Sequence, residues 1–343
     1  MRIKINRKTL SNQALFPIFD VIFRFIEIGR HSFDVGSIEE IATSDWGHHL
    51  GKTAVELIKR GALSTSYTVT DQNPLVVVDE AAPAGGETDF ESRVTRVAPL
   101  EAIYFLTLPF SLIVENEVYD GGFLLWMAKA VNNQSFLSAY RNQRFQFRHA
   151  GGKTGLSVSS QVFSDGVWPR SDGAYSRALR LWNGVMLDSD AEFPGHTPND
   201  GIVTACGKTT AWVHELQARS IENYIPKETM LNFLTDGADK TRVHNYFDLS
   251  EVQRRHYNLK KGFKTEASKA DFQADVGIPA TLRALYEDVP EISWSCLSSG
   301  FGSGLSRIFV EEQFRPNTGL VAFPSTSAKE EVEEILKKVL RSV

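Results

Sequence analysis

The sequence predicts an α/β protein built around a parallel-rich sheet with helices on its faces. Between residues 100 and 235, short apolar runs typical of buried strands alternate with segments of helical periodicity, a pattern typical of strands joined by crossover helices. Two of these apolar runs are followed at once by carboxylates. With 343 residues, the chain is also long enough to carry further modules on either side of the sheet.

The composition is that of an ordinary globular protein, with 42% hydrophobic and 23% charged residues. A net charge of -5 excludes a strongly cationic coat, so any nucleic-acid contact must come from local basic patches. The two cysteines, Cys206 and Cys296, lie far apart, which argues against a disulfide framework or a cysteine zinc site. Because the N-terminus lacks a signal-peptide core and no apolar run can span a bilayer, we expect a cytoplasmic protein without a membrane partner.

Residues 1–98 are predicted to form an accessory module, either mixed α/β or winged-helix-like, because helical segments come first and short β-type runs follow. The helical segments are Leu15–Ile28, Ser37–Ala42 and His49–Arg60, the last ending at Gly61, and the β-type runs are Ser66–Thr70 and Leu75–Asp79. The segment 81–86, rich in Ala, Pro and Gly, is predicted to be a linker or a long turn.

Residues 99–240 are predicted to form the central sheet domain, and residues 241–343 a mostly helical extension packed on it. The expected strands are Ser111–Val114, Arg144–Arg148, Val185–Leu187 and Thr210–Val213, and the expected helices are Gly121–Val131, Ala174–Trp182 and Pro226–Leu234. In the extension we expect a basic stretch at Arg254–Lys264 and an amphipathic terminal helix at Ala328–Val343.

Carboxylates follow two of the expected strands at the point where each strand ends. Glu115 comes directly after the first, and Asp188 and Asp190 come directly after the third. Sites in parallel sheets form outside the carboxyl ends of the strands, so these side chains are expected to meet. If the strand continues, Asp188 and Asp190 share one face; if the chain turns, they still lie at one strand end. Converging carboxylates favour a Mg²⁺ site, whereas turn formation or helix capping is the alternative for each residue alone.

Two further segments fit the same edge of the sheet. His149-Ala150-Gly151-Gly152-Lys153 follows the second strand, and Glu222 lies just before a predicted helix. Glycines let the backbone approach a phosphate closely, and Lys153 would neutralise it, with a plain turn as the alternative. A similar triplet, Gly207-Lys208-Thr209, comes later in the chain. Each lysine stands in a Gly-Lys-Thr triplet, but both triplets lack the earlier glycine of a P-loop, so we reject a P-loop ATPase.

In this order, the residues resemble the Toprim domain, which is shared by topoisomerases, bacterial primases, recombination proteins and OLD-type nucleases. The resemblance covers residues 108–235. Ser111–Phe123 is similar to the first motif and Asp188-Ser189-Asp190 to the second, while His214–Tyr224 resembles a segment of OLD-like and defence-associated Toprim proteins. The chain departs from the family at Asn116, where a glycine is usual, and it has one more residue than usual between Glu115 and Asp120.

The resemblance implies a Mg²⁺- or Mn²⁺-dependent nuclease that hydrolyses phosphodiester bonds of DNA or RNA, with DNA the favoured partner, as an antiviral defence effector. Glu115 would be a metal ligand or general base, Asp188 and Asp190 would hold the metal, and Glu222 would be a further ligand. Lys153 or Lys208 would stabilise charge on the phosphate as a catalytic residue.

The resemblance also bears on partners. OLD-type proteins carry an ATPase on the same chain, so an ATPase or sensor would here be a separate protein, and a homo-oligomer is compatible with the sequence. The basic stretch Arg254–Lys264 is a candidate for contact with a nucleic-acid backbone. Two alternatives stay open: a binding or scaffold module with a decayed Toprim site, and a non-nuclease Toprim enzyme such as a topoisomerase or primase core.

Overall fold

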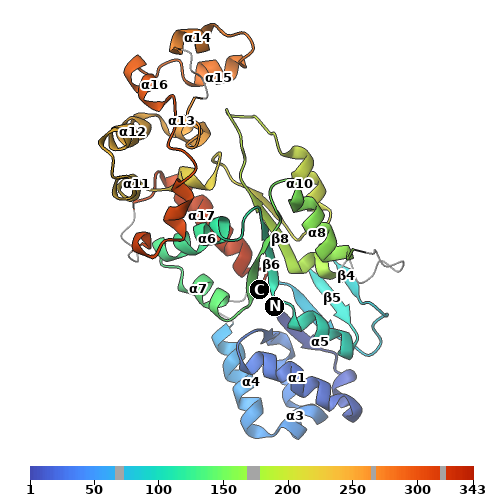
Figure 1. The fold of residues 1–343 in the computed structure, drawn as a ribbon. Helices are drawn as coiled ribbons and strands as arrows, with labels where there is room; N and C mark the ends of the chain where they lie inside the picture. The colour runs from blue at the N-terminus through green and yellow to red at the C-terminus, as the bar shows by residue number, and fades with distance from the viewer. Residues whose placement is uncertain (66–72, 168–177, 264–267, 317–321) are drawn as a thin grey trace.

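A computed structural model describes residues 1–65, 73–167, 178–263, 268–316 and 322–343. The described chain holds two sheets in which parallel pairing dominates, with helices packed on them, so the predicted α/β class is confirmed (Figure 1). Among the described residues, no helix is both long and apolar enough to cross a membrane.

The N-terminal sheet contains five strands in the order β2-β1-β3-β5-β4. Among the described strands of this sheet, β4 and β5 pair antiparallel and the other neighbours pair in parallel. The strands are β1 (Arg2–Ile5), β2 (Ser32–Phe33), β3 (Leu75–Val78), β4 (Glu87–Asp89) and β5 (Val94–Val97). The helices of this region are α1 (Phe16–Glu27), α2 (Ile38–Ala42), α3 (Asp45–Leu50) and α4 (Lys52–Thr65).

These elements correct two predictions for the N-terminal region. Its described residues form a mixed α/β sheet, and the winged-helix arrangement is wrong because β1 pairs in parallel with β3 across about 70 residues of sequence. The expected helix at 49–60 is two helices, since the chain breaks at Gly51, where φ is +81°, and α4 then continues past Gly61. The expected run at 66–70 lies outside the described residues, and segment 81–86 is a turn between β3 and β4.

The central sheet contains four parallel strands in the order β7-β6-β8-β9. The strands are β6 (Phe110–Val114), β7 (Phe145–His149), β8 (Asn183–Leu187) and β9 (Val213–Glu215), so the fourth begins three residues later than expected. Its helices are α5 (Pro99–Thr107), α6 (Tyr119–Ala130), α7 (Gln134–Arg141), α8 (Gly155–Asp165) and α10 (Asp200–Gly207). Of the expected helix at 174–182, residues 174–177 lie outside the described part.

The alternating directions of the buried side chains along β6 explain why helices cover both faces of this sheet. All five residues of the strand are buried, and successive side chains point to opposite faces. Leu112 and Val114 join the core that contains α6 and the C-terminal helix α17 (Thr326–Leu340), whereas Ile113 joins the core with Leu156 of α8 and Cys206 of α10. Figure 1 shows α6, α7 and α17 on one side of β6 and β8, with α8 and α10 on the other.

From residue 227 onward, the described elements are all helical. They are α11 (Lys227–Phe233), α12 (Gly237–Asp248), α13 (Glu251–His256), α14 (Lys269–Ala274), α15 (Ala280–Leu285), α16 (Glu291–Leu297) and α17, with 3₁₀ turns at Leu305–Phe309 and Glu312–Phe314. This region shares its hydrophobic core with the central sheet through α6 and α17. By contrast, α5 contributes Ala102, Phe105 and Leu106 to the core of the N-terminal sheet.

Candidate functional site

The ends of β6 and β8 bring Glu115 and Asp188 together at one edge of the central sheet. The two strands are adjacent and parallel, so the residues after them emerge side by side. Lys153 bridges the two strand ends, with its Nζ 3.0 Å from the Asp188 carbonyl oxygen and 3.8 Å from Glu115 Oε1. The expected convergence of these two residues is therefore present in the structure.

The chain turns immediately after β8, which separates the two aspartates of the Asp-x-Asp motif. Asp190 adopts a left-handed conformation with φ of +52°, a region that Asp tolerates better than most residues. Asp188 therefore points into the protein, while the Asp190 side chain remains 55% exposed. The backbone N–H of Asp190 donates to the carbonyl of Arg219 at 3.0 Å and fixes the turn.

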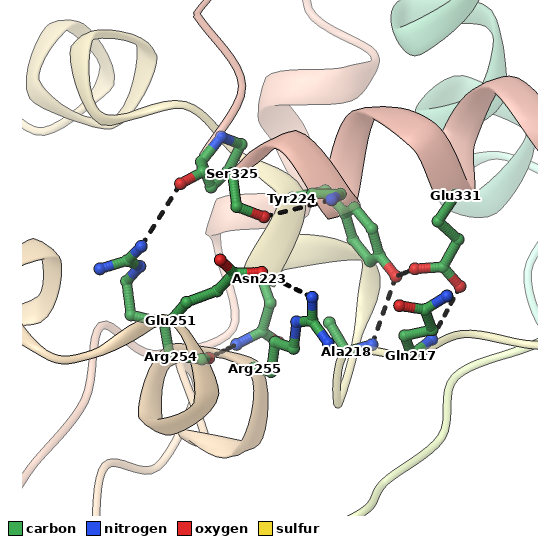
Figure 2. A pocket seen from close by; sticks show the side chains of 11 residues that line it. Gln217, Ala218, Asn223, Tyr224, Glu251, Arg254, Arg255, Ser325 and Glu331 are labelled. Carbon is green, nitrogen blue, oxygen red and sulfur yellow. Dashed lines mark hydrogen bonds and ion pairs between the residues drawn. The ribbon is translucent and has the colours of Figure 1, made fainter.

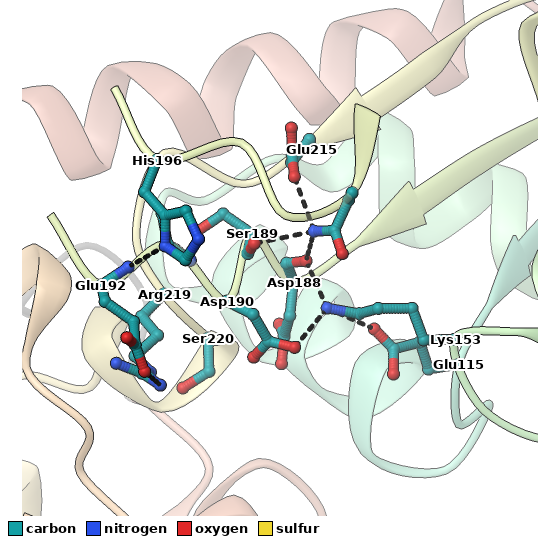
Figure 3. Close-up of polar contacts among 12 residues, drawn as sticks. Glu115, Lys153, Asp188, Ser189, Asp190, Glu192, His196, Glu215, Arg219 and Ser220 are labelled. Carbon is teal, nitrogen blue, oxygen red and sulfur yellow. Dashed lines mark hydrogen bonds and ion pairs between the residues drawn. The ribbon is translucent and has the colours of Figure 1, made fainter. Parts of the chain in front are cut away.

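The glycine turn after β7 places Lys153 among these carboxylates. Gly151 and Gly152 have φ of +77° and +103°, which disfavour residues with a side chain, and the N–H of Gly152 donates to the Glu115 carbonyl at 3.3 Å. Lys153 Nζ then lies 2.6 Å from Asp190 Oδ2, 3.8 Å from Glu115 Oε1 and 3.0 Å from the Asp188 carbonyl oxygen. Figure 3 shows this lysine between Glu115 and Asp190.

A short 3₁₀ turn, Ile221–Tyr224, supplies the third carboxylate of the cluster. The backbone N–H of Ile221 donates to Asp188 Oδ1 at 3.1 Å, so the turn is tied directly to the end of β8. The Glu222 side chain is only 1% exposed, and one of its oxygens, Oε1, lies 3.2 Å from Lys260 Nζ. The other oxygen, Oε2, is buried without a hydrogen-bond partner.

Lys260 is a site residue that the sequence did not reveal. It stands in a tight turn in which Asn258 Oδ1 accepts hydrogen bonds from the backbone N–H groups of Lys260 and Lys261. Burial lowers the pKa of Lys260, but Glu222 and Asp188 raise it, and the net pKa is raised. The ammonium group of Lys260, 45% of whose side chain is exposed, therefore remains protonated beside these carboxylates.

Asp120, in the first turn of α6, is the fourth carboxylate of the cluster. Its Oδ2 accepts the backbone N–H of Asn116 at 2.8 Å, and Asn116 Oδ1 accepts the N–H groups of Val118 and Tyr119. Asn116 does not have a positive φ, so this turn does not need the glycine that the Toprim family usually has there. The departure from the family motif leaves Glu115 in place.

The pKa values of Asp188, Asp120 and Glu115 are raised, mainly by burial and then by neighbouring carboxylates. Burial raises the pKa of Asp188 well above its usual range, and Glu222, Asp120 and Glu115 raise it further. Burial, Glu115 and Glu222 raise the pKa of Asp120 to about 7. The pKa of Glu115 is also raised, mainly by burial, although Lys153 opposes the shift. Such a cluster favours protons or cations as neighbours.

A cation other than the two lysines would relieve the repulsion among these carboxylates, and their oxygen atoms suit a hard metal ion. The described residues contain no group of three or more His, Cys, Asp or Glu side chains already arranged around a metal position. However, Glu115 Oε1 and Glu222 Oε2 are buried without hydrogen-bond partners. Carboxylate oxygens are the ligands that Mg²⁺ and Mn²⁺ prefer, so Glu115, Asp188 and Glu222 fit such an ion chemically.

One sequence-based candidate, Lys208, lies away from the carboxylate cluster. Lys208 is exposed at the C-terminal end of α10, whereas the residue before this helix, Asn199, donates to the carbonyls of Asp188 and Ser189. The helix thus starts at the carboxylate cluster and leads away from it, and of the two candidate lysines only Lys153 contacts the carboxylates in the described structure.

The basic stretch Arg254–Lys264 is largely engaged inside the protein. Arg254 donates to the carbonyl oxygens of Phe247, Leu249 and Pro324, and Arg255 pairs with Glu251. Lys260 belongs to the carboxylate cluster, Lys261 is exposed, and Lys264 lies outside the described residues. The stretch therefore offers little of its charge to an external nucleic-acid backbone.

The turn that carries Glu222 is held from behind by α17. Glu331 is buried, and its carboxylate accepts hydrogen bonds from the Tyr224 hydroxyl, from the backbone N–H of Gln217 at 2.8 Å and from His214 Nε2 at 3.0 Å. Figure 2 shows Tyr224 reaching Glu331 across the small cavity behind the turn. Lys338 Nζ lies 3.0 Å from His214 Nδ1. This network positions the turn without touching the cluster.

Comparisons of the chain with protein-family models, curated proteins and solved structures find no significant match.

Proposed function

We propose that this protein is a metal-dependent nuclease that hydrolyses phosphodiester bonds of DNA or RNA. The observation that carries the proposal is the cluster of Glu115, Asp120, Asp188 and Glu222 at the carboxyl edge of a parallel sheet, with Glu222 buried, the other three partly buried and two lysines among them. Ligand sites in open α/β sheets lie at this edge, and a cluster with raised pKa values is a candidate for chemistry rather than for structural support.

In this proposal Glu115, Asp188 and Glu222 hold Mg²⁺ or Mn²⁺, with Asp190 at the exposed rim. When bound, the metal would polarise the phosphate and lower the pKa of water. The raised pKa of Glu115 suits a group that accepts a proton from an attacking water. Lys153 takes the role of binding phosphate oxygens, because its ammonium group lies at the exposed side of the cluster beside Asp190.

The resemblance to the Toprim domain supports the same proposal. The carboxylate after the first strand, the glycine turn after the second and the Asp-x-Asp after the third all lie at one edge of a four-stranded parallel sheet. The proposed context is antiviral defence, with any ATPase or sensor on a separate protein. A second candidate is a binding module with a decayed site, which is favoured by one observation: Lys153 and Lys260 already neutralise part of the cluster without a metal.

Cleavage assays with matched variants separate these two functions. We expect the purified protein to degrade plasmid DNA or RNA with Mg²⁺ or Mn²⁺ and to stop when EDTA is added. Asp188→Ala should reduce the cleavage rate by more than about 100-fold, because the loss of a residue that only supports a metal ligand already costs up to that much. Asp248→Asn, an exposed change in α12, is the control and should cleave like the wild type. Folded wild type that cleaves neither nucleic acid with either metal would leave the decayed binding module as the better proposal.

A further inference from the structure

A groove of about 890 Å³ opens between α6, α7, the edge strand β7 and the segment from Phe309 to Pro316. Glu117 and Val118 line one part of it, and they follow Glu115 by only two and three residues. The groove is therefore continuous along the chain with the end of β6. Its volume lies within the range of ordinary ligand sites.

The groove is cationic, although the whole chain carries a net charge of -5. Lys129, Arg141 and Arg315 line it, against a single acidic lining residue, Glu117. Within the described part of the chain, neither Lys129 nor Arg141 makes an ion pair, and Arg315 approaches Glu312 only to 3.6 Å. With three cationic lining residues against one acidic one, the wall of the groove carries a net positive charge that attracts an anionic ligand.

Aromatic rings and amides accompany these cations. Tyr140 is 39% exposed, and its ring centroid lies 5.5 Å from that of Phe147, which also lines the groove. The amide side chains of Gln134 and Gln146 complete the wall. Cations that follow a backbone, together with exposed rings on which bases stack, characterise sites for single-stranded nucleic acid.

We propose that this groove binds single-stranded nucleic acid and guides it to the carboxylate cluster. Lys129 and Arg141 bind phosphates, and Tyr140 stacks on an unpaired base, which a duplex does not expose. The inference deepens the proposed nuclease function by naming single-stranded nucleic acid as the substrate class. It rests on that function only for the claim that the bound strand leads to the carboxylate cluster. Binding itself is independent of cleavage and can be measured without metal.

Fluorescence anisotropy with labelled single-stranded and duplex oligonucleotides in EDTA tests the proposal. We expect Lys129→Ala/Arg141→Ala to weaken single-strand binding by about 25-fold at 0.1 M salt and to lower the slope of log affinity against log salt by about 1.4, since each phosphate contact contributes about 0.7 to that slope. The control Arg7→Ala/Lys8→Ala, which removes two exposed cations from the N-terminal region, should change neither quantity.

The aromatic contribution has its own pair of variants. Tyr140→Ala should weaken single-strand binding at least about 5-fold, with Tyr140→Phe binding like the wild type. Tyr104→Ala changes a tyrosine that is 47% exposed on α5 and serves as the matched control. Circular dichroism on each variant establishes that it is folded, and because Lys129 and Arg141 lie at the surface of the groove, their variant remains informative if Tyr140→Ala unfolds.

The outcomes separate this proposal from the nuclease itself. Groove-dependent strand binding without cleavage by the wild type would support the groove and reject the nuclease. Cleavage by the wild type with strand affinity unaffected in all groove variants would overturn the groove alone. Tighter binding of the duplex than of the single strand would also overturn it, as would binding of an extended peptide in the groove with no binding of an oligonucleotide.

Discussion

Replacing Asp120 by Asn tests whether the ionised carboxylates of the cluster destabilise the folded protein. The pKa of Asp120 is raised from 3.8 to about 7 by burial and by neighbouring carboxylates, a difference that corresponds to about 4 kcal/mol of folding free energy. Asn keeps the oxygen that accepts the Asn116 N–H but never ionises. The substitution therefore removes the charge and preserves the local hydrogen bond.

The sign of the effect follows from proton binding. Because the folded chain binds the Asp120 proton more tightly than the unfolded chain, it holds more protons between about pH 4 and pH 7. The free energy of unfolding therefore falls as the pH rises through this window, and the contribution is lost above pH 7. We expect Asp120→Asn to match the wild type near pH 4 and to exceed its stability at pH 8 by up to about 4 kcal/mol.

Urea titrations of both proteins from pH 4 to pH 8 measure this difference in the free energy of unfolding. Asp248→Asn on α12 is an exposed control, and its difference from the wild type should not vary with pH. Addition of 10 mM Mg²⁺ should reduce the stability difference between the two proteins at pH 8. A cation whose dissociation constant is 100-fold below its concentration stabilises the wild type by about 2.7 kcal/mol. A gap that stays constant across this pH range, or an Asn variant that is less stable at pH 8, would refute the reasoning.

Three further predictions follow from single contacts. Lys153→Met should slow cleavage at least about 10-fold in a plasmid assay, whereas Lys208→Met should not, because only Lys153 contacts the cluster; equal losses would contradict the assignment. Gly262→Ala should destabilise the protein by at least about 2 kcal/mol in urea, because φ is +68° and a Cβ would lie within 2.5 Å of three backbone atoms. Gly207→Ala, which has open space around it, should be neutral or stabilising. Glu331→Gln should cost about 3 kcal/mol in the same assay, since an amide nitrogen would replace one oxygen that accepts buried hydrogen bonds; an unchanged midpoint would show that the network does not bear on stability.

The central sheet could be predicted because its signals are local. β6 and β8 are short runs whose residues are all buried, and an apolar run bounded by turn residues is visible in the sequence. Glu115 and Asp188 follow directly from the ends of those runs and from the rule that parallel strands open at one edge. The turn at Asp190 decided between the two geometries that the Asp-x-Asp spacing allowed.

The remaining features depend on contacts between distant parts of the chain. Lys260 reaches Glu222 only because a tight turn of the helical region folds back on the sheet, and nothing in the local sequence distinguishes it from its neighbour Lys261. Likewise, β1 is a four-residue strand whose partner lies about 70 residues away. Such pairing has no periodicity signal, which is why helices followed by short β-type runs resembled a winged helix.

The hydrogen bond between Tyr224 and Glu331 has a consequence for the order in which the protein is assembled during synthesis. The two residues are 107 positions apart, so at about 5–20 residues per second the ribosome adds α17 roughly 5–20 s after the turn that α17 supports. Until then a nascent chain carries Glu115, Asp188 and Glu222 without the helix that holds the last of them in place. Completion of the site is thereby delayed until nearly the whole described chain has emerged.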